Sequence, residues 1–167
     1  MAAQTGRTVG RYIRFLVDDS GGTLREIPID SINGVGLDSP EADVAALQDA
    51  VKSVLLETPD CTIEITGPFD NSAAQAAGGS GAAPALSGSH TVLYPIAGVN
   101  TPLTLDVRFG IRHDWETGEP QFGITSSSAN GFVCTKYTVD GASMKYAASF
   151  KVFAGSASPA WGTSAET

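Results

Sequence analysis

Histidine and serine are the side chains in this chain that could act as a general base and a nucleophile. His113 is followed directly by Asp114, and a histidine oriented by a carboxylate is the base of many hydrolases. Adjacency in sequence does not create that geometry, and an ordinary loop is the better interpretation of this pair. The run Ser126–Ser128 is typical of a turn, and His90 stands alone. We therefore expect no enzymatic activity, and a hydrolase that uses His113 is the weakest hypothesis.

Metal, cofactor and membrane sites are not predicted either. The chain has no phosphate-binding or zinc-binding motif and no calcium-loop spacing. Cys61 and Cys134 lie in expected strands without a Cys/His cluster, so we expect two buried free thiols, as suits a reducing cytoplasm. No window approaches the length of a membrane span, and the N-terminus has no apolar core of signal-peptide length. We expect no cofactor, no membrane partner and synthesis in the cytoplasm.

Charge is unevenly distributed along the chain. The net charge is -8, from 18 acidic and 10 basic residues, which argues against a sequence-reading nucleic-acid binder. Arg7, Arg11 and Arg14 nevertheless fall within the first 14 residues, which contain no acid. Two interpretations stay open: a solvated N-terminal arm over residues 1–10 and beyond, or an arm that reaches the acidic body of another copy.

Alternating apolar and polar residues predict a chain that is mostly β-strand. The clearest alternations are 61–66 and 103–111, and a Gly-Pro turn ends the first. With no repeating strand–helix unit, we expect one domain over residues 1–167 of the α+β, mainly β class. Its simplest form is an antiparallel β-sandwich or flattened barrel. The expected strands are 11–17, 24–29, 61–66, 91–94, 103–111, 121–125, 131–138 and 143–153.

One flanking α-helix is expected at about residues 40–57. Ser39 can cap it, Pro40 suits the first helical position, and apolar residues recur at helical spacing from Val44 to Leu55. Thr58-Pro59 ends the pattern. We expect this helix to cover an open face of the sheet.

Two segments have little to bury. Residues 71–89 are of low complexity and include Pro84 and Leu86; they form either an idle surface loop or a segment that orders on a neighbouring copy. Residues 154–167 form a C-terminal tail with Trp161, which docks on the body or on a neighbour. The candidate inter-subunit contacts are Arg7, Arg11, Arg14, Pro84, Leu86 and Trp161.

Several stretches, taken in order, resemble the major tail tube proteins of long-tailed bacteriophages. They are the segment 31–37, the strand and turn at 59–70, the pair of strands at 131–139 and 144–150, and the tail at 158–162. The resemblance implies a structural virion subunit whose copies form rings, typically hexamers, stacked into a tube that conducts the genome. It further implies a location in the virion tail, contacts with other tail proteins, and an N-terminal arm or long loop that bridges rings.

A conduit for DNA should not bind its cargo. An acidic inner wall would repel phosphate within about 8–10 Å at physiological salt, and we expect Glu64 and Asp106 to face that lumen. Alternative hypotheses are a head decoration protein, a head–tail connector protein, and a carbohydrate- or ligand-binding β-sandwich with Trp115 as its anchor.

Overall fold

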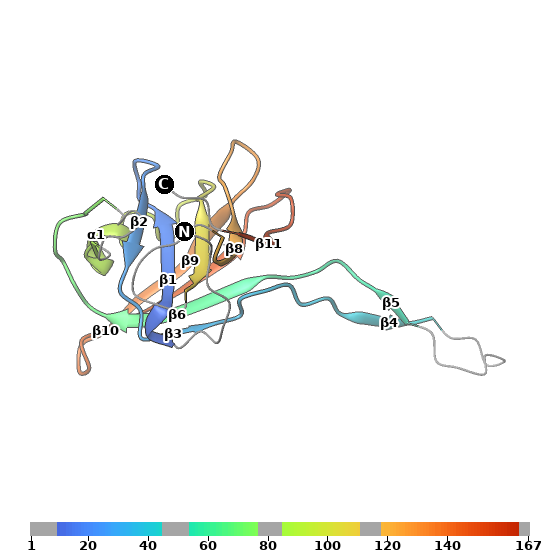
Figure 1. Ribbon diagram of the computed structural model, residues 1–167, viewed down its shortest axis with the longest axis horizontal. Coiled ribbons are helices and arrows are strands. Elements are labelled where there is room, and N and C mark those ends of the chain that lie inside the picture. The colour runs from blue at the N-terminus through green and yellow to red at the C-terminus, as the bar shows by residue number, and fades with distance from the viewer. Residues whose placement is uncertain (1–9, 45–53, 77–84, 111–117, 164–167) are drawn as a thin grey trace.

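A computed structural model describes residues 10–44, 54–76, 85–110 and 118–163 (Figure 1). Its body consists of two antiparallel sheets that face one another, and one short helix, α1 (Ser89–Leu93), lies at one end. The α+β, mainly β class and the antiparallel sandwich are therefore confirmed, and the sheets do not close into a barrel. His113, Trp115 and Arg7 lie outside the described residues, as does Pro84.

The five-stranded sheet has the order β11-β8-β7-β1-β2, and the four-stranded sheet has the order β3-β6-β10-β9. Every strand pairs antiparallel with its neighbours. The first sheet comprises β1 (Ile13–Asp18), β2 (Leu24–Ile27), β7 (Leu105–Phe109), β8 (Pro120–Ile124) and β11 (Ala160–Thr163). The second comprises β3 (Ser31–Asn33), β6 (Thr62–Pro68), β9 (Phe132–Asp140) and β10 (Lys145–Val152). A 3-10 turn, η1 (Gly10–Tyr12), precedes β1.

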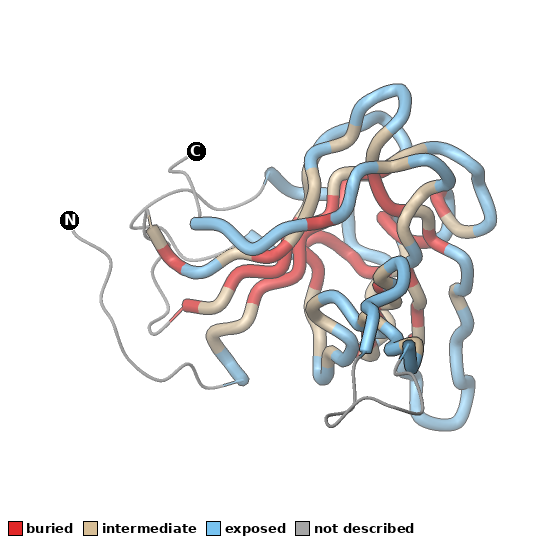
Figure 2. The backbone as a smooth tube through the Cα atoms, turned by 90° about the vertical axis from the view of Figure 1, so that its right-hand side faces the viewer, coloured by how far each residue is buried: buried red, intermediate tan, exposed pale blue. Residues whose placement is uncertain are grey.

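The core lies between the two sheets, where Figure 2 shows the buried positions gathered. Side chains alternate across a strand, so every second residue of β1, β6 and β10 faces inward. The rings of Phe15 and Phe150 meet across the layers at 5.4 Å between centroids. The fully buried large side chains are Tyr146, Phe15, Phe122, Phe132, Phe150, Leu16, Ile27, Ile63, Ile65, Leu93 and Leu105.

The chain passes from one sheet to the other between β2 and β3. Tyr146 fixes this crossing, because its hydroxyl donates to the carbonyl oxygen of Pro28 at 2.7 Å. Gly67 allows the close approach: an added Cβ would lie 2.5 Å from the Pro28 oxygen and 2.8 Å from the Tyr146 ring. The two layers are therefore joined at this side by backbone as well as by core packing.

A two-stranded ribbon projects from the body between β3 and β6 (Figure 1). We call residues 34–60, so far as they are described, the arm; it contains β4 (Glu41–Asp43) paired antiparallel with β5 (Val54–Leu56). At its root the amides of Asp38 and Asp60 each donate to the other's carbonyl oxygen, at 2.9 and 2.7 Å. Farther out, the amide of Glu57 donates to the Pro40 carbonyl at 2.8 Å.

The arm corrects the prediction of a helix at 40–57. Both described ends of that segment are strands, and residues 45–53 lie outside the description. Of the apolar residues that suggested a helical stripe, the described ones, Val44, Val54 and Leu55, are exposed on the arm and cover no sheet face. Backbone hydrogen bonds between β4 and β5 replace the packing that a helix would have needed.

Two smaller predictions are also wrong. The expected strand at 91–94 falls in α1 and the turn that follows it, so Ser89 opens a helix rather than closing the low-complexity loop. The expected C-terminal tail includes β11, which pairs with β8 along four residues. The strands at 13–18, 24–27, 62–68, 105–109, 120–124, 132–140 and 145–152 agree with the expected ones within a few residues.

Candidate assembly surfaces

The arm exposes large apolar side chains. Leu55 and Leu56 are 61% and 63% exposed, and Val44 is 56% exposed. Val54 and Leu37 are exposed as well. A two-stranded ribbon alone is marginally stable in water, and contiguous exposed apolar groups mark interaction sites. These side chains can therefore be buried only by contact with another surface.

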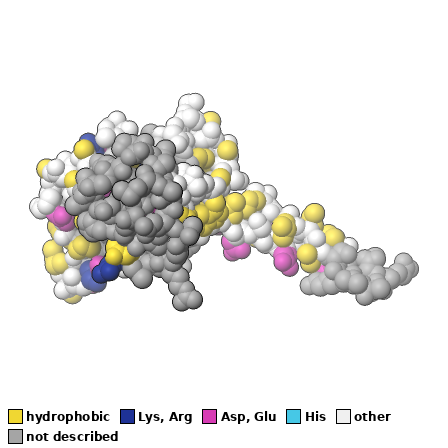
Figure 3. All heavy atoms as spheres, viewed as in Figure 1, with side chains coloured by type: hydrophobic (Ala, Val, Ile, Leu, Met, Phe, Trp, Pro, Cys, Tyr) yellow, Lys and Arg dark blue, Asp and Glu magenta, His cyan; other side chains and the backbone are white. Residues whose placement is uncertain are grey.

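Acidic side chains follow the same ribbon. The described parts of the arm carry Asp38, Glu41, Asp43, Glu57 and Asp60, and no lysine or arginine. Figure 3 shows acidic and apolar groups side by side along the projection. The arm thus combines apolar contact area with concentrated negative charge.

Each sheet also ends in strands that have a neighbour on one side only. In the four-stranded sheet these are β3 and β9, and in the five-stranded sheet they are β2 and β11. Among the described residues, the outer edge of β9 makes backbone hydrogen bonds to other segments at its start, through Phe132 and Cys134. Residues 136–140 of β9 therefore offer backbone groups to a further strand.

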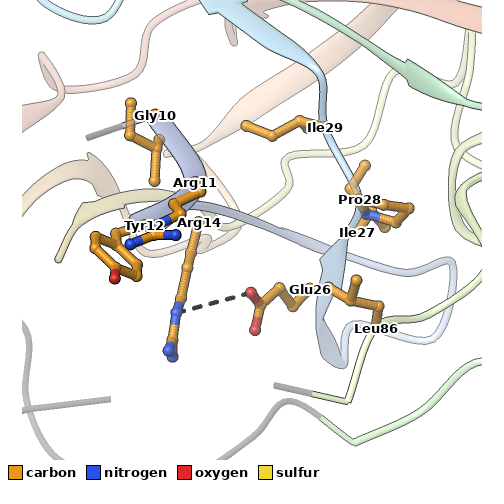
Figure 4. A pocket seen from close by; sticks show the side chains of 10 residues that line it. Gly10, Arg11, Tyr12, Arg14, Glu26, Ile27, Pro28, Ile29 and Leu86 are labelled. Atoms are coloured by element: carbon orange, nitrogen blue, oxygen red, sulfur yellow. Dashed lines mark ion pairs between the residues drawn. The ribbon is translucent and has the colours of Figure 1, made fainter. Parts of the chain in front are cut away.

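Three of the predicted contact residues meet in one cleft of about 240 Å³ beside β1 and β2 (Figure 4). Arg11 is exposed and lies over the Tyr12 ring, 4.7 Å from its centroid. Leu86, 44% exposed, forms the opposite wall. Arg14 lies inside the cleft rather than on a solvated arm, so that interpretation is wrong for Arg14.

Arg14 belongs to a group of buried charges on the outer side of the five-stranded sheet. Its Nε lies 3.9 Å from Glu26 Oε1, and the two residues are 7% and 3% exposed. Arg108 and Asp106 on β7 form a second pair at 3.8 Å. Burial raises the pKa of Glu26 to about 7, because removal from water disfavours its charge more than the nearby arginines favour it.

The expected exposure of Asp106 is wrong in the described chain. Asp106 is 8% exposed, and burial raises the pKa of its carboxyl although Arg108 and a hydrogen bond with Gln121 act in the opposite direction. Alternation along β7 places this residue on the outer face as predicted, but its side chain is buried there. Asp106 therefore presents no acid to a lumen from this position.

Glu64 is exposed on the outer face of the four-stranded sheet, in line with its predicted position. The register, however, places lysines on the same face: Ser149 lies between Glu64 and Lys136, and Lys151 lies opposite Thr62. Lys145 occupies this face as well, paired with Asp30 at 2.9 Å. The described part of this face is of mixed charge, rather than the acidic wall that the sequence suggested.

Trp161 packs on its own chain while keeping part of its surface exposed. Its ring lies 5.1 Å from that of Phe122 and 5.5 Å from that of Phe109, and the residue is 56% exposed. Trp161, on the edge strand β11, therefore docks on its own chain and still has exposed surface that a neighbouring molecule could contact.

The ends of the low-complexity segment 71–89 are tied to the body. Ser87 Oγ accepts from the Gln75 amide at 2.8 Å, and the Ser87 amide donates to the Glu26 carbonyl at 2.8 Å. Arg25 Nη1 donates to the Gln75 carbonyl at 2.9 Å. The arm at residues 34–60 is a projecting element that the sequence did not predict.

Cys61 and Cys134 are buried free thiols, as predicted. The described residues include no group of three or more potential metal ligands. Within the same residues, no helix is long and apolar enough to cross a membrane. Comparison with known protein families finds no matching family model, and no curated protein matches the sequence.

Proposed function

We propose that this protein is a structural subunit that assembles with copies of itself, and that the assembly is the tail tube of a long-tailed bacteriophage. The observation that carries the proposal is the arm, which exposes Leu55 and Leu56 on a ribbon with no core of its own. A soluble monomer gains nothing from such an element, whereas a subunit buries it against a neighbour.

The four-stranded sheet supports the same proposal. Its edge strands β3 and β9 lie at opposite sides of one continuous surface. A repeated contact between different edges is head-to-tail, and such contacts close into a ring when the rotation between copies allows it. The arm, leaving from the end of β3, then extends away from the body toward another copy (Figure 1).

The sequence resemblance supplies the tail tube as the particular assembly. The body has the expected sandwich, and its arm takes the bridging role that the resemblance gives to a long loop. The lumen of such a tube would be lined by a surface of mixed charge if the four-stranded sheet faces inward. Weak, salt-screened contacts on that surface suit DNA that passes without specific binding.

Electron microscopy and sedimentation of the purified full-length protein test the proposal. We expect rings or tubes whose abundance rises with protein concentration, and location of the chain in the tail of virions. The comparison is an arm-shortened variant in which residues 39–59 are replaced by Asn-Gly, a two-residue turn that suits the hydrogen-bonded pair Asp38–Asp60. A monomer at all concentrations, or a chain found only on the capsid shell, would refute the proposal.

A further inference from the structure

A cavity of about 140 Å³ lies at the end of the sandwich where a turn joins β1 to β2 (Figure 1). Segments far apart in the sequence enclose it: this turn, the loop that follows α1, the residues before β7, and Ser126 after β8. We call it the turn cavity. No residue of the arm lines it, so its chemistry is separate from that of the assembly surfaces.

Asp18 contributes a buried carboxylate to the wall of the turn cavity. The residue is 5% exposed, and its Oδ2 accepts from the Thr104 amide at 2.8 Å and from the Ser126 hydroxyl at 3.1 Å. Both donors are neutral, and within the described chain no lysine or arginine forms an ion pair with Asp18. Its Oδ1 has no hydrogen-bond donor among the same residues. Such a carboxylate is costly to remove from water unless a cation compensates it.

The neighbouring acid of the turn cavity, Asp19, already has its partners. Its Oδ1 accepts from two backbone amides of the turn, at 2.9 and 3.0 Å, and its Oδ2 accepts from Arg25 Nε at 2.8 Å. Asp18 has no such cation. The pKa of the nearby Asp106 carboxyl is raised by burial and further by the charge of Asp18. A cation beside Asp18 would therefore also relieve repulsion between two carboxylates.

The rest of the wall is largely apolar. Its apolar members are Pro95, Ile96, Val99, Pro102 and Leu103. Ile96 and Leu103 are 3% and 5% exposed, whereas Val99 is 46% exposed, so the apolar wall runs from the core to the surface. The amides of Leu103 and Phe132 each donate to the other's carbonyl oxygen, at 2.8 and 2.9 Å, which holds this wall against β9. The turn cavity is therefore preformed.

A carboxylate oxygen beside an apolar wall suits a primary ammonium on an alkyl stem. An ammonium is a compact charge that one oxygen can accept, whereas a guanidinium is bound best by both oxygens of a carboxylate. Because Oδ2 of Asp18 is already used by two donors, the site favours the ammonium. The volume corresponds to roughly four or five groups of the size of water, at about 30 Å³ each, which matches a butylammonium group.

We propose that the turn cavity binds a primary ammonium on a short alkyl chain, with the ammonium at Asp18 and the methylenes against Ile96 and Leu103. The lysine side chain of another protein and a free aliphatic amine share this chemistry. The site goes beyond the proposed function and does not depend on it, because its lining belongs to the body of one chain.

Titration of the full-length protein with n-butylammonium, followed through the NMR methyl signals of Ile96 and Leu103, tests this site. We expect saturable shifts with butylammonium and none with n-butanol, which has the same stem without the charge. Asp18→Asn should weaken binding by about tenfold or more, because it removes a hydrogen bond to a charged group. Its amide oxygen can still accept from Thr104 and Ser126, so the fold should be kept.

Asp140→Asn is the matched control and should bind butylammonium as the unmodified protein does. Asp140 is an exposed acid outside the turn cavity, and its carboxylate likewise accepts from neutral donors, the Ala142 amide at 3.0 Å and Ser143 Oγ at 2.6 Å. Melting temperatures establish that both variants are folded.

A short peptide with one lysine, and the same peptide with arginine instead, distinguish the sources of the ammonium. Binding of the lysine peptide in preference to the arginine peptide indicates a protein lysine, and binding of butylammonium without either peptide indicates a free amine. Failure of butylammonium to bind, or equal binding by n-butanol, by the arginine peptide or by folded Asp18→Asn, would overturn the proposal. None of these results depends on whether the protein assembles.

Discussion

Phe15 and Phe150 bring the two sheets together, with ring centroids 5.4 Å apart and both residues fully buried. Phe15 comes from β1, which lies between β7 and β2 in the five-stranded sheet, and Phe150 comes from β10 of the four-stranded sheet. The body therefore has a core that is complete without the arm. Stability of the fold and assembly of the protein should respond to different substitutions.

The core is the first part to test. Phe150→Ala removes a ring from between the sheets, and we expect it to lower the free energy of unfolding by about 3–5 kcal/mol. Urea unfolding followed by circular dichroism measures this loss at a concentration where the protein is monomeric. A loss below about 1 kcal/mol would contradict the central position of this ring.

The arm should show the opposite behaviour. Leu55→Asp with Leu56→Asp should leave the melting temperature of the monomer unchanged, because both side chains are more than half exposed. The same variant should abolish assembly in light scattering. The matched control is Val99→Asp, which replaces an exposed apolar residue, 46% exposed, on the body. Equal effects of the two variants on assembly would contradict a specific role for the arm.

The root of the arm depends on Gly34. Its φ is 75°, and a Cβ there would overlap the carbonyl oxygen of Thr62. Gly34→Ala should therefore destabilise the protein by about 2 kcal/mol or more and redirect the arm. Gly162→Ala is the control, because no atom lies within 4 Å of a Cβ built there. In thermal unfolding Gly34→Ala should have the lower melting temperature of the two variants, and in assembly assays it should assemble less well than Gly162→Ala.

Glu26 should make stability depend on pH. Burial raises its pKa from 4.5 to about 7, so the folded protein holds this proton more tightly than the unfolded chain. Its contribution to folding is complete below about pH 4.5 and is lost as the pH rises toward about 7. The loss is at most about 3 kcal/mol, since one unit of pKa corresponds to about 1.4 kcal/mol.

The measurement compares the unmodified protein with Glu26→Gln at several pH values. The free energy of unfolding of the unmodified protein, minus that of Glu26→Gln, should fall across this window and then level off. Glu64→Gln provides a control at an exposed carboxyl on the other sheet. A difference that stays constant from pH 4.5 to 7.5 would refute the account of Glu26.

Sequence patterns predicted the body better than the arm, for a physical reason. Strands such as β6 and β10 bury one face, so Ile63, Ile65 and Phe150 leave a period-two pattern that can be read directly. The described arm buries neither face in the monomer, so its apolar residues need not alternate with polar ones. The sequence spacing of these residues from Val44 to Leu55 fits helical periodicity without reflecting a buried helical face. The consecutive apolar residues at 54–56 are the feature of the sequence that could have predicted a strand.

The candidate surfaces were predicted only in part. Arg11, Leu86 and Trp161 are exposed on the body as expected. Arg14 and Asp106 were expected to be accessible because charged residues usually are, but they are only 7% and 8% exposed. Helix α1 was not predicted, because it is too short to leave a periodic signal and has no side-chain cap at Gly88.

The acids of the arm have a consequence for newly made chains. Both β4 and β5 have bare backbone edges, and two such ribbons from different chains would readily pair and precipitate. Like charges on Glu41, Asp43 and Glu57 oppose that encounter. We therefore expect chains of the proposed subunit to stay apart until they assemble, and high salt, which screens this repulsion, should promote disordered aggregates before it promotes ordered growth.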